Sequence, residues 1–241
     1  LSTSLSLTHK KLLDQTTAGI SADKTVDVAR LALNFDDGKP GQNVNFGNVT
    51  LTRGNLDLSG NNTDLAMDKQ TANRHGNFDK IEYSLGRLQR LSEKNYLNVA
   101  ITGQVAFDNL DSSEKMSLGG SSGVRAYPTG EGMGDTAAIF RSEFRHNFSN
   151  KWQGIIFYDH GATTLNNRTW PNWNSANVDL VNSYQLKGAG IGLNLINNDD
   201  YDFGIYTGRR TDHNPGRGNT GNDADGTLEK LRFWLLFSRK F

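Results

Sequence analysis

Apolar and polar residues alternate with a period of two along most of this chain. Within residues 97–107, Leu97, Val99 and Ile101 share one face, while Asn98 and Thr102 share the other. Successive side chains of a β-strand point to opposite sides of a sheet, so this pattern predicts a strand with one apolar and one polar face. The same alternation recurs in residues 25–35, 78–85, 137–148, 188–196 and 228–241.

Residues 1–12, 48–58, 152–164 and 201–209 also have the composition of strands, which brings the prediction to about ten. A helix of one or two turns is expected only at Thr63–Thr71. Clusters of Gly, Asn and Asp predict short turns at 36–41, 149–150 and 197–200, and long connections at 59–77, 165–177 and 211–226. Alternating long and short connections are typical of an all-β, antiparallel, up-and-down transmembrane β-barrel.

A soluble antiparallel sandwich is the alternative, because its strands also alternate apolar and polar positions. The length of the strands, the one-sided loop lengths and the charges on the polar faces favour the barrel. In a barrel the apolar faces contact lipid, and the charged faces line a hydrated lumen.

Composition limits the function more than it defines it. The 241 residues carry 26 Lys+Arg and 26 Asp+Glu, so the net charge is zero and nucleic acid is not expected as a partner. No cysteine is present, which excludes disulfides and thiolate metal sites within these residues. The mean hydropathy is −0.60 and apolar runs such as Phe233–Phe237 are too short for a spanning helix, which by hydropathy alone indicates a soluble protein. A spanning strand escapes that criterion, because it needs only about 9–11 residues.

The chain begins at Leu1, without an initiator methionine or a signal peptide. We interpret it as a mature protein or as a piece of a longer one.

The long connection 108–135 contains the stretch GGSSGVRAYPTGEGMGD, residues 119–135, with a single cation at Arg125. Connections this long in a compact domain are usually functional or disordered. The pair Tyr127-Pro128 restricts the chain, and the surrounding glycines permit close approach and positive φ. We therefore expect a shaped hairpin that enters a confined space and presents Arg125 to an acceptor.

Strand 152–164 offers such an acceptor. Its alternation places Phe157, Asp159 and Gly161 on the lumen side, and Ile156 and Tyr158 on the lipid side. A carboxylate on the inner wall would take a bidentate, charge-assisted hydrogen bond from Arg125. From these residues alone, the favoured interpretation is that Asp159 is a solvated lumen charge and Arg125 an exposed loop cation.

Two motifs together carry a family resemblance. Val124, Arg125, Ala126, Tyr127 and Pro128, followed by GEGMGD, and the F-x-D-x-G of the strand 152–164 resemble the paired signature of the TpsB family. These are the outer-membrane transporters of two-partner secretion, or haemolysin secretion/activation proteins, and they belong to a superfamily that includes the assembly factor BamA. LDSSEKMSLGG at 110–120 and TLTRGNLDL at 50–58 resemble the same family.

The resemblance implies a C-terminal barrel portion, residues 1–241, equivalent to strands 7–16 of a sixteen-stranded barrel. It implies that the loop 108–135 is inserted in the lumen and that Arg125 contacts Asp159. The first six strands, the periplasmic POTRA domains and the plug helix of the family would be absent. The chain departs from the family's usual Val-Arg-Gly-Tyr at Ala126. If the usual glycine needs positive φ, the turn here must differ.

The resemblance also suggests partners. They are a secreted exoprotein such as a haemolysin, adhesin or toxin, the lipid of a Gram-negative outer membrane, and the barrel assembly machinery during insertion. The last strand ends in Phe241, which fits a C-terminal insertion signal. Arg141, Glu143 and Arg145 form a ladder of lumen charges and are candidate braces for the inserted loop.

Other chemistry is less well supported. The five histidines form no metal-binding pair, GEGMGD lacks the strand-to-helix context of a nucleotide fingerprint, and no catalytic set gathers in the sequence. We therefore expect no metal, no cofactor and no enzymatic activity. A lipolytic or proteolytic outer-membrane enzyme and a soluble glycan-binding sandwich remain the alternative functions.

Overall fold

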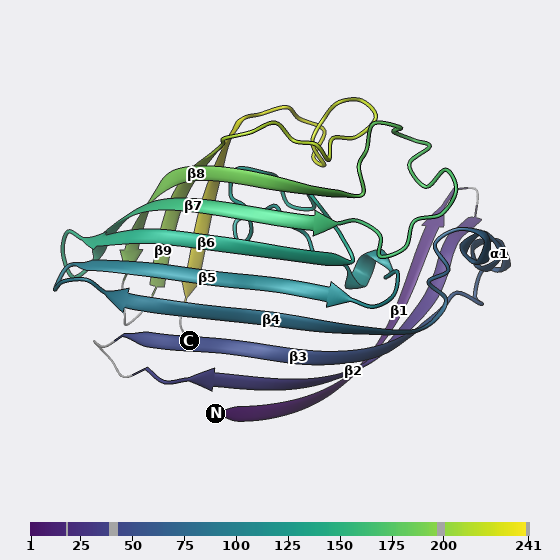
Figure 1. Ribbon diagram of the computed structural model, residues 1–241, viewed down its shortest axis with the longest axis horizontal. Helices are drawn as coiled ribbons and strands as arrows, with labels where there is room; N and C mark the ends of the chain where they lie inside the picture. The colour runs from purple at the N-terminus through teal and green to yellow at the C-terminus, as the bar shows by residue number, and fades with distance from the viewer. Residues whose placement is uncertain (18, 39–42, 197–200, 240–241) are drawn as a thin grey trace.

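The computed structural model describes residues 1–17, 19–38, 43–196 and 201–239, which form one sheet of ten antiparallel strands (Figure 1). Each strand pairs with the next one in the chain. The strands are β1 (Ser2–Thr16), β2 (Gly19–Asp36), β3 (Val44–Asp57), β4 (Gly76–Arg90), β5 (Asn95–Ala106), β6 (Thr136–Asn147), β7 (Trp152–Thr164), β8 (Ser183–Ile196), β9 (Tyr201–Arg210) and β10 (Leu231–Arg239). The predicted all-β, up-and-down fold is confirmed. A sandwich of two packed sheets is wrong for the described residues, because their strands belong to one sheet.

The predicted helix forms as α1 (Asn62–Gln70), and a short 3-10 helix, η1 (Ser112–Glu114), lies in the connection after β5. The side chain of Asn61 accepts hydrogen bonds from the backbone N–H groups of Thr63 and Asp64 and so caps α1. No helix among the described residues has the length and apolar character needed to cross a membrane.

Most short connections lie at one end of the strands and the long ones at the other (Figure 1). The long connections are 58–75, 107–135, 165–182 and 211–230. The last two run further than the predicted limits of 177 and 226. One reason is that the amide of Asn174 donates to the carbonyls of Val178 and Leu180, which holds this segment in the loop. The predicted turn at 197–200 lies outside the described residues.

The sheet is strongly curved, so β9 and β10 stand behind β6, β7 and β8 in Figure 1, and the connection 107–135 lies in the hollow. Within the described residues, β1 pairs only with β2 and β10 only with β9. The described sheet is therefore an open, curved wall with a convex and a concave face.

Strand β7 shows how the alternation divides the two faces. Ile156 and Tyr158 are exposed on the convex side. Phe157 and Asp159, which alternate with them along the strand, are buried on the concave side. This agrees with the predicted orientation. Large apolar side chains are exposed along the convex face of most other strands, including Leu31, Leu33, Leu85, Ile101, Phe140, Phe144, Ile191, Phe233 and Leu235. An exposed apolar band of this extent suits contact with lipid.

The concave face is not uniformly polar, which corrects our expectation of a wet, charged lumen. One apolar cluster lies under the first part of the connection 107–135, where Leu110 packs with Val26, Val28, Leu56, Leu58, Phe78 and Ala106. A second cluster surrounds the middle of that connection and contains Leu118, Val124, Ala126, Tyr127, Ala137, Ile139, Tyr184 and Leu186. The long connection is thus packed onto the wall as part of the core, because its apolar side chains need a dry partner surface.

We expect Ile156→Arg to impair assembly in the membrane, because a cation at the middle of a lipid-facing strand costs about 2–4 kcal/mol. Heat-modifiable gel mobility of the protein in outer-membrane fractions measures the assembled fraction. Thr220→Arg, in the exposed part of the connection 211–230, is the matched control and should assemble normally. Equal assembly of both variants would contradict a lipid-facing convex surface.

Candidate functional site

The connection 107–135 folds back on itself before it reaches the wall. Met116 and Gly134 exchange two backbone hydrogen bonds of 3.0 and 2.9 Å, which closes the base of the loop. Nearer the tip, the N–H of Gly120 donates to the carbonyl of Tyr127, and that of Val124 donates to the carbonyl of Leu118. Positive φ angles at Gly120, Gly130 and Gly132 provide the reversals. The result is a compact hairpin that presents residues 124–128 to the concave face.

Asp159 of β7 receives three hydrogen bonds from Arg125. The Nε and Nη2 atoms of the guanidinium lie 2.8 and 2.7 Å from the two carboxylate oxygens, and the backbone N–H donates to Oδ2 over 3.1 Å. Arg125 and Asp159 are 1% and 0% exposed. This is the bidentate pairing considered in the sequence analysis, and the structure brings the two groups together.

A second carboxylate completes the surroundings of the guanidinium. Its Nη1 atom lies 2.7 Å from Oε1 of Glu143 on β6, and its central carbon lies 3.5 Å from the centre of the Phe157 ring. The Tyr206 ring on β9 lies 5.6 Å away. Arg125 is therefore bound by two anions and stacked on an aromatic face, a combination that offsets the loss of water around a buried cation.

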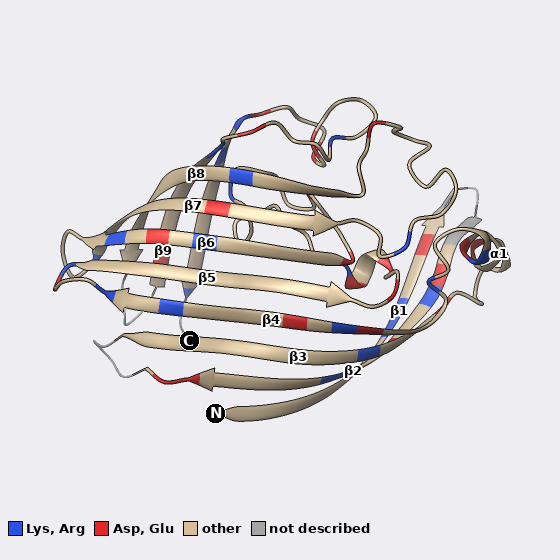
Figure 2. Cartoon of the chain, viewed as in Figure 1, with Lys and Arg blue, Asp and Glu red and all other residues tan. Residues whose placement is uncertain are grey.

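The three candidate braces on β6 take different parts in this site. Arg145 donates twice to Oε2 of Glu143, at 2.9 and 2.6 Å. Arg141 bonds to Oε1 of the same carboxylate at 3.2 Å and to the carbonyl of Ser122 in the loop, also at 3.2 Å. Figure 2 shows basic and acidic positions close together on β6, and an acidic position on the neighbouring β7. Glu143 is thus the direct brace, Arg141 joins wall and loop, and Arg145 reaches the loop only through Glu143.

The other motif residues pack rather than carry charge. Val124, Ala126 and Tyr127 are each 0% exposed, and Pro128 is buried beside them. The Tyr127 ring lies 5.1 Å from the guanidinium carbon of Arg210. Gly161 on β7 faces Val124 and Leu118, and a Cβ at that position would lie 2.9 Å from Cγ2 of Val124. The glycine of F-x-D-x-G therefore leaves room for the loop.

Ala126 does not adopt the conformation that would have required glycine. Among the described residues, only Asn73 and Asn172 have a positive φ without being glycine. The turn after Arg125 therefore uses backbone angles that any residue adopts, and an altered turn is not needed to accommodate the methyl group.

Trp234 on β10 is a contact of the loop that the sequence analysis missed. Its indole Nε1 donates to the backbone carbonyl of Arg125 over 2.8 Å. The sequence did indicate the orientation of Trp234. Phe233 and Leu235 face outward, so the residue between them faces the inner side of the sheet. A buried indole N–H needs an acceptor, but nothing in the pattern shows which one.

Ion pairs with distant strands hold the first arm of the loop, and these were also missed. The Glu114 carboxylate lies 2.7 Å from Lys10 Nζ, 3.0 Å from Arg30 Nη2 and 3.2 Å from Lys80 Nζ. Asp111 lies 2.7 Å from Lys24. These cations come from β1, β2 and β4, and no motif links them to residues so far along the chain.

The connection 211–230 contacts the hairpin. Glu131 accepts a hydrogen bond of 2.8 Å from the N–H of Ala224. Asp223 in the same connection binds Arg210, Asn214 and Arg232. Burial by itself would raise the pKa of Asp223, but its bonds with Arg210, Asn214 and Arg232 outweigh burial and lower that pKa. This connection is therefore anchored by an ionised carboxylate.

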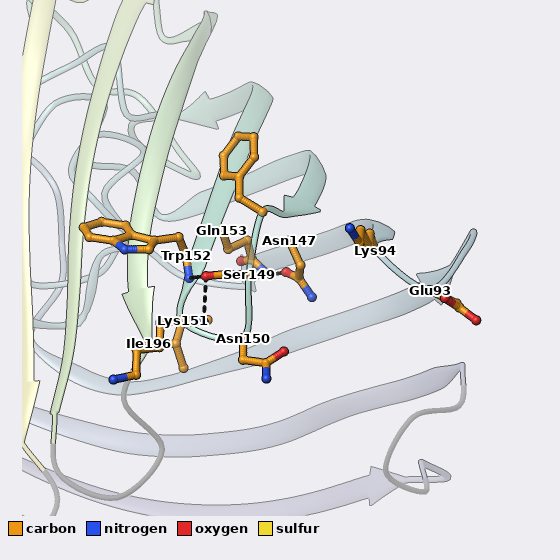
Figure 3. Close-up of a pocket in the computed structure, with 10 residues that line it drawn as sticks. Glu93, Lys94, Asn147, Ser149, Asn150, Lys151, Trp152, Gln153 and Ile196 are labelled. Atoms are coloured by element: carbon orange, nitrogen blue, oxygen red, sulfur yellow. Dashed lines mark hydrogen bonds between the residues drawn. The ribbon is translucent and has the colours of Figure 1, made fainter.

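A separate cavity of about 650 Å³ lies at the end of the sheet with the short turns (Figure 3). Lys94, Ser149, Trp152, Gln153 and Ile196 are among its lining residues. None of the Arg125 contacts belongs to it. The predicted insertion signal Phe241 lies outside the described residues.

A family model described as the haemolysin secretion/activation protein ShlB/FhaC/HecB matches residues 8–195. The chain belongs to this family. The resemblance seen in the two motifs is confirmed. Membership in the ShlB/FhaC/HecB family places the chain among the TpsB proteins of two-partner secretion.

Individual relatives agree with this assignment. The heme/hemopexin transporter protein HuxB of Haemophilus influenzae (strain 86-028NP) is 27% identical over 249 residues, which cover 100% of this chain and 41% of that protein. HuxB of strain ATCC 51907 is 29% identical over 177 residues, 72% of this chain and 29% of that protein. The chain thus spans less than half the length of these relatives. CdiB from Escherichia coli has the same fold, with a TM-score of 0.72 at 18% identity over 99% of this chain and 42% of that chain.

We expect Arg125→Lys to loosen the loop although it keeps the charge. An ammonium cannot make the forked contact with Asp159 and reach Glu143 at the same time, and loss of one partner of a buried pair costs about 3–5 kcal/mol. Limited proteolysis of the assembled protein should show faster cleavage within 107–135. Arg53→Lys, at a side chain that is 69% exposed, is the control. Identical cleavage of the two variants would show that the fork does not hold the loop.

Proposed function

We propose that this chain is the C-terminal barrel portion of an outer-membrane transporter that secretes, and in some cases activates, a large partner exoprotein. Family membership supports the class of protein. The contact between Arg125 on the loop and Asp159 on the wall is the observation that carries the mechanism. The ten strands are equivalent to strands 7–16 of a sixteen-stranded barrel, and residues 108–135 are its lumen-inserted loop.

The seated loop obstructs the passage in this proposal. The hairpin fills part of the hollow of the curved sheet, and both clusters of buried apolar residues include side chains of the connection 107–135. An extended polypeptide crosses a membrane more easily along a polar wall, since its backbone groups need hydrogen-bond partners. Transit therefore requires the loop to shift or to share the lumen with the exoprotein.

Polar wall surface remains beside the loop. A cavity of about 440 Å³ is lined by Asn48, Glu82, Ser84 and Thr102 of β3, β4 and β5, together with Glu114 of the loop. Its amides and hydroxyls can exchange hydrogen bonds with a moving chain. Charged side chains share this lining, among them Lys10, Arg30, Lys80 and Lys115. This side of the hollow is the proposed path of the exoprotein.

Arg125, Asp159 and Glu143 act as a lock on the loop. The guanidinium stays charged at any physiological pH, so removal of either carboxylate leaves a buried charge with fewer partners. Arg141 and Arg145 hold Glu143 in position. The lock gives the empty transporter one defined loop position, to which the loop returns after each export event.

The remaining assignments follow from this function. The convex face contacts outer-membrane lipid in a Gram-negative bacterium, and the C-terminal Phe241 is read by the barrel assembly machinery during insertion. Similarity to the heme/hemopexin transporter protein HuxB makes a heme- or hemopexin-binding exoprotein the first partner to test.

We predict that Arg125→Ala and Asp159→Ala in the full-length protein each reduce secretion of the cognate exoprotein by about tenfold or more, because each removes the closest partner of a buried charge. Exoprotein in culture supernatants is compared at equal amounts of assembled transporter, with Arg53→Ala as the exposed control. Normal export by both lock variants would overturn the proposed role of the pair.

A further inference from the structure

Glycines of the concave wall form a slot for the backbone of residues 124–126. A Cβ at Gly188 on β8 would lie 2.4 Å from Cβ of Ala126. A Cβ at Gly208 on β9 would lie 2.9 Å from the carbonyl carbon of Arg125. Both distances are below 3.0 Å, and real Cβ atoms essentially never lie this close to a non-bonded heavy atom. The loop therefore sits at a depth that only glycine permits at these wall positions.

The slot surrounds the lock. Gly188 is the cross-strand partner of Asp159 in the β7–β8 pair and of Arg210 in the β8–β9 pair. Trp234 on β10 closes the slot by its hydrogen bond to the Arg125 carbonyl. The backbone of the loop tip is thus held by shape and by an indole, independently of the charges that hold the guanidinium.

This arrangement gives the alanine at position 126 a physical role. Ala126 is fully buried and its backbone does not need glycine. Its methyl group occupies the space that Gly188 leaves empty. The two positions therefore share one small volume, and enlarging either one overfills it.

We propose that Ala126 and Gly188 are a matched pair of positioning residues that sets how deeply the loop seats, with Trp234 holding the tip from β10. One added methyl group at either position pushes the loop away from the wall and so pulls Arg125 away from Asp159. The effect on export rests on the proposed function, whereas the effect on loop position does not.

Loop position is measured by the reactivity of a buried thiol. The 241 residues contain no cysteine, so Val124→Cys introduces a thiol that is unique among them, at a side chain that is 0% exposed. In the full-length protein, labelled with a membrane-impermeant maleimide, we expect Gly188→Ala to raise the labelling rate by about tenfold or more, because overpacking displaces the loop.

The double variant separates this pair from a general disturbance of β8. Ala126→Gly removes the 2.4 Å contact and leaves the new methyl 3.3 Å from the Arg209 carbonyl oxygen and 3.6 Å from the Cα of residue 126. Labelling of the Gly188→Ala, Ala126→Gly variant should return to within about threefold of the starting protein. Gly218→Ala, whose Cβ would meet nothing closer than 3.8 Å, is the matched control and should label at the starting rate.

Two further variants keep the test informative if Gly188→Ala does not assemble. Ala126→Val makes the same overlap from the loop side and should also raise labelling. Trp234→Phe keeps an aromatic ring but removes the indole N–H donor, and it should raise labelling about threefold or more, in line with loss of one hydrogen bond. A double variant that labels as fast as Gly188→Ala alone, or unchanged labelling in Ala126→Val, would overturn the matched pair.

Export is scored separately on the same variants. Faster labelling together with reduced secretion supports both the matched pair and the proposed function. Faster labelling with normal secretion supports the pair and contradicts the loop's role in export. Unchanged labelling contradicts the pair while leaving the transporter assignment intact.

Discussion

A buried guanidinium needs anions at fixed places, and this requirement organises the wall around Arg125. Asp159 and Glu143 supply the anions from neighbouring strands, in a register that pairs Arg141 with Asp159 and Glu143 with Phe157. Because strand side chains alternate between faces, a slip of one residue in either strand would turn its carboxylate toward the convex, apolar side. The loop's cation and the register of β6 and β7 are therefore mutually dependent, and loss of either removes the closest partner of a buried charge.

Charge alone does not hold the loop. Ion pairs at Glu114 and Asp111 fix its first arm to β1, β2 and β4, and glycines on β8 and β9 accommodate its tip. Trp234 adds a contact from the last described strand. The loop thus contacts most of the curved sheet. In the proposed transporter, movement of the loop would therefore break contacts with most of the strands. This is a physical reason for a loop of this length to be ordered despite its many glycines.

The strands and the central contact were predictable from sequence, whereas the supporting contacts were not. Alternation in residues 152–164 correctly put Asp159 inward, since period two is a local property. The pairing with Arg125 was implied by the family resemblance, whereas the two charged residues alone favoured two solvated groups. Local pattern could not show that Lys24 meets Asp111, or that Trp234 meets the Arg125 carbonyl, because those contacts depend on how far the sheet curves. The apolar inner surface at Val26 and Val28 was missed for a similar reason: only the packed loop makes that surface dry.

The central claim is that the loop tip rests on the inner wall beside Asp159 and leaves it for export. The most direct measurement is oxidative cross-linking of Arg125→Cys with Asp159→Cys in the full-length transporter in outer membranes, where the backbone N–H of the first residue lies 3.1 Å from the carboxylate of the second. The account predicts that a disulfide forms and arrests secretion. Adding a reductant should then raise secretion above the level measured for the oxidised protein. Failure of the pair to cross-link in the assembled protein, or undiminished secretion while it is cross-linked, would contradict the account.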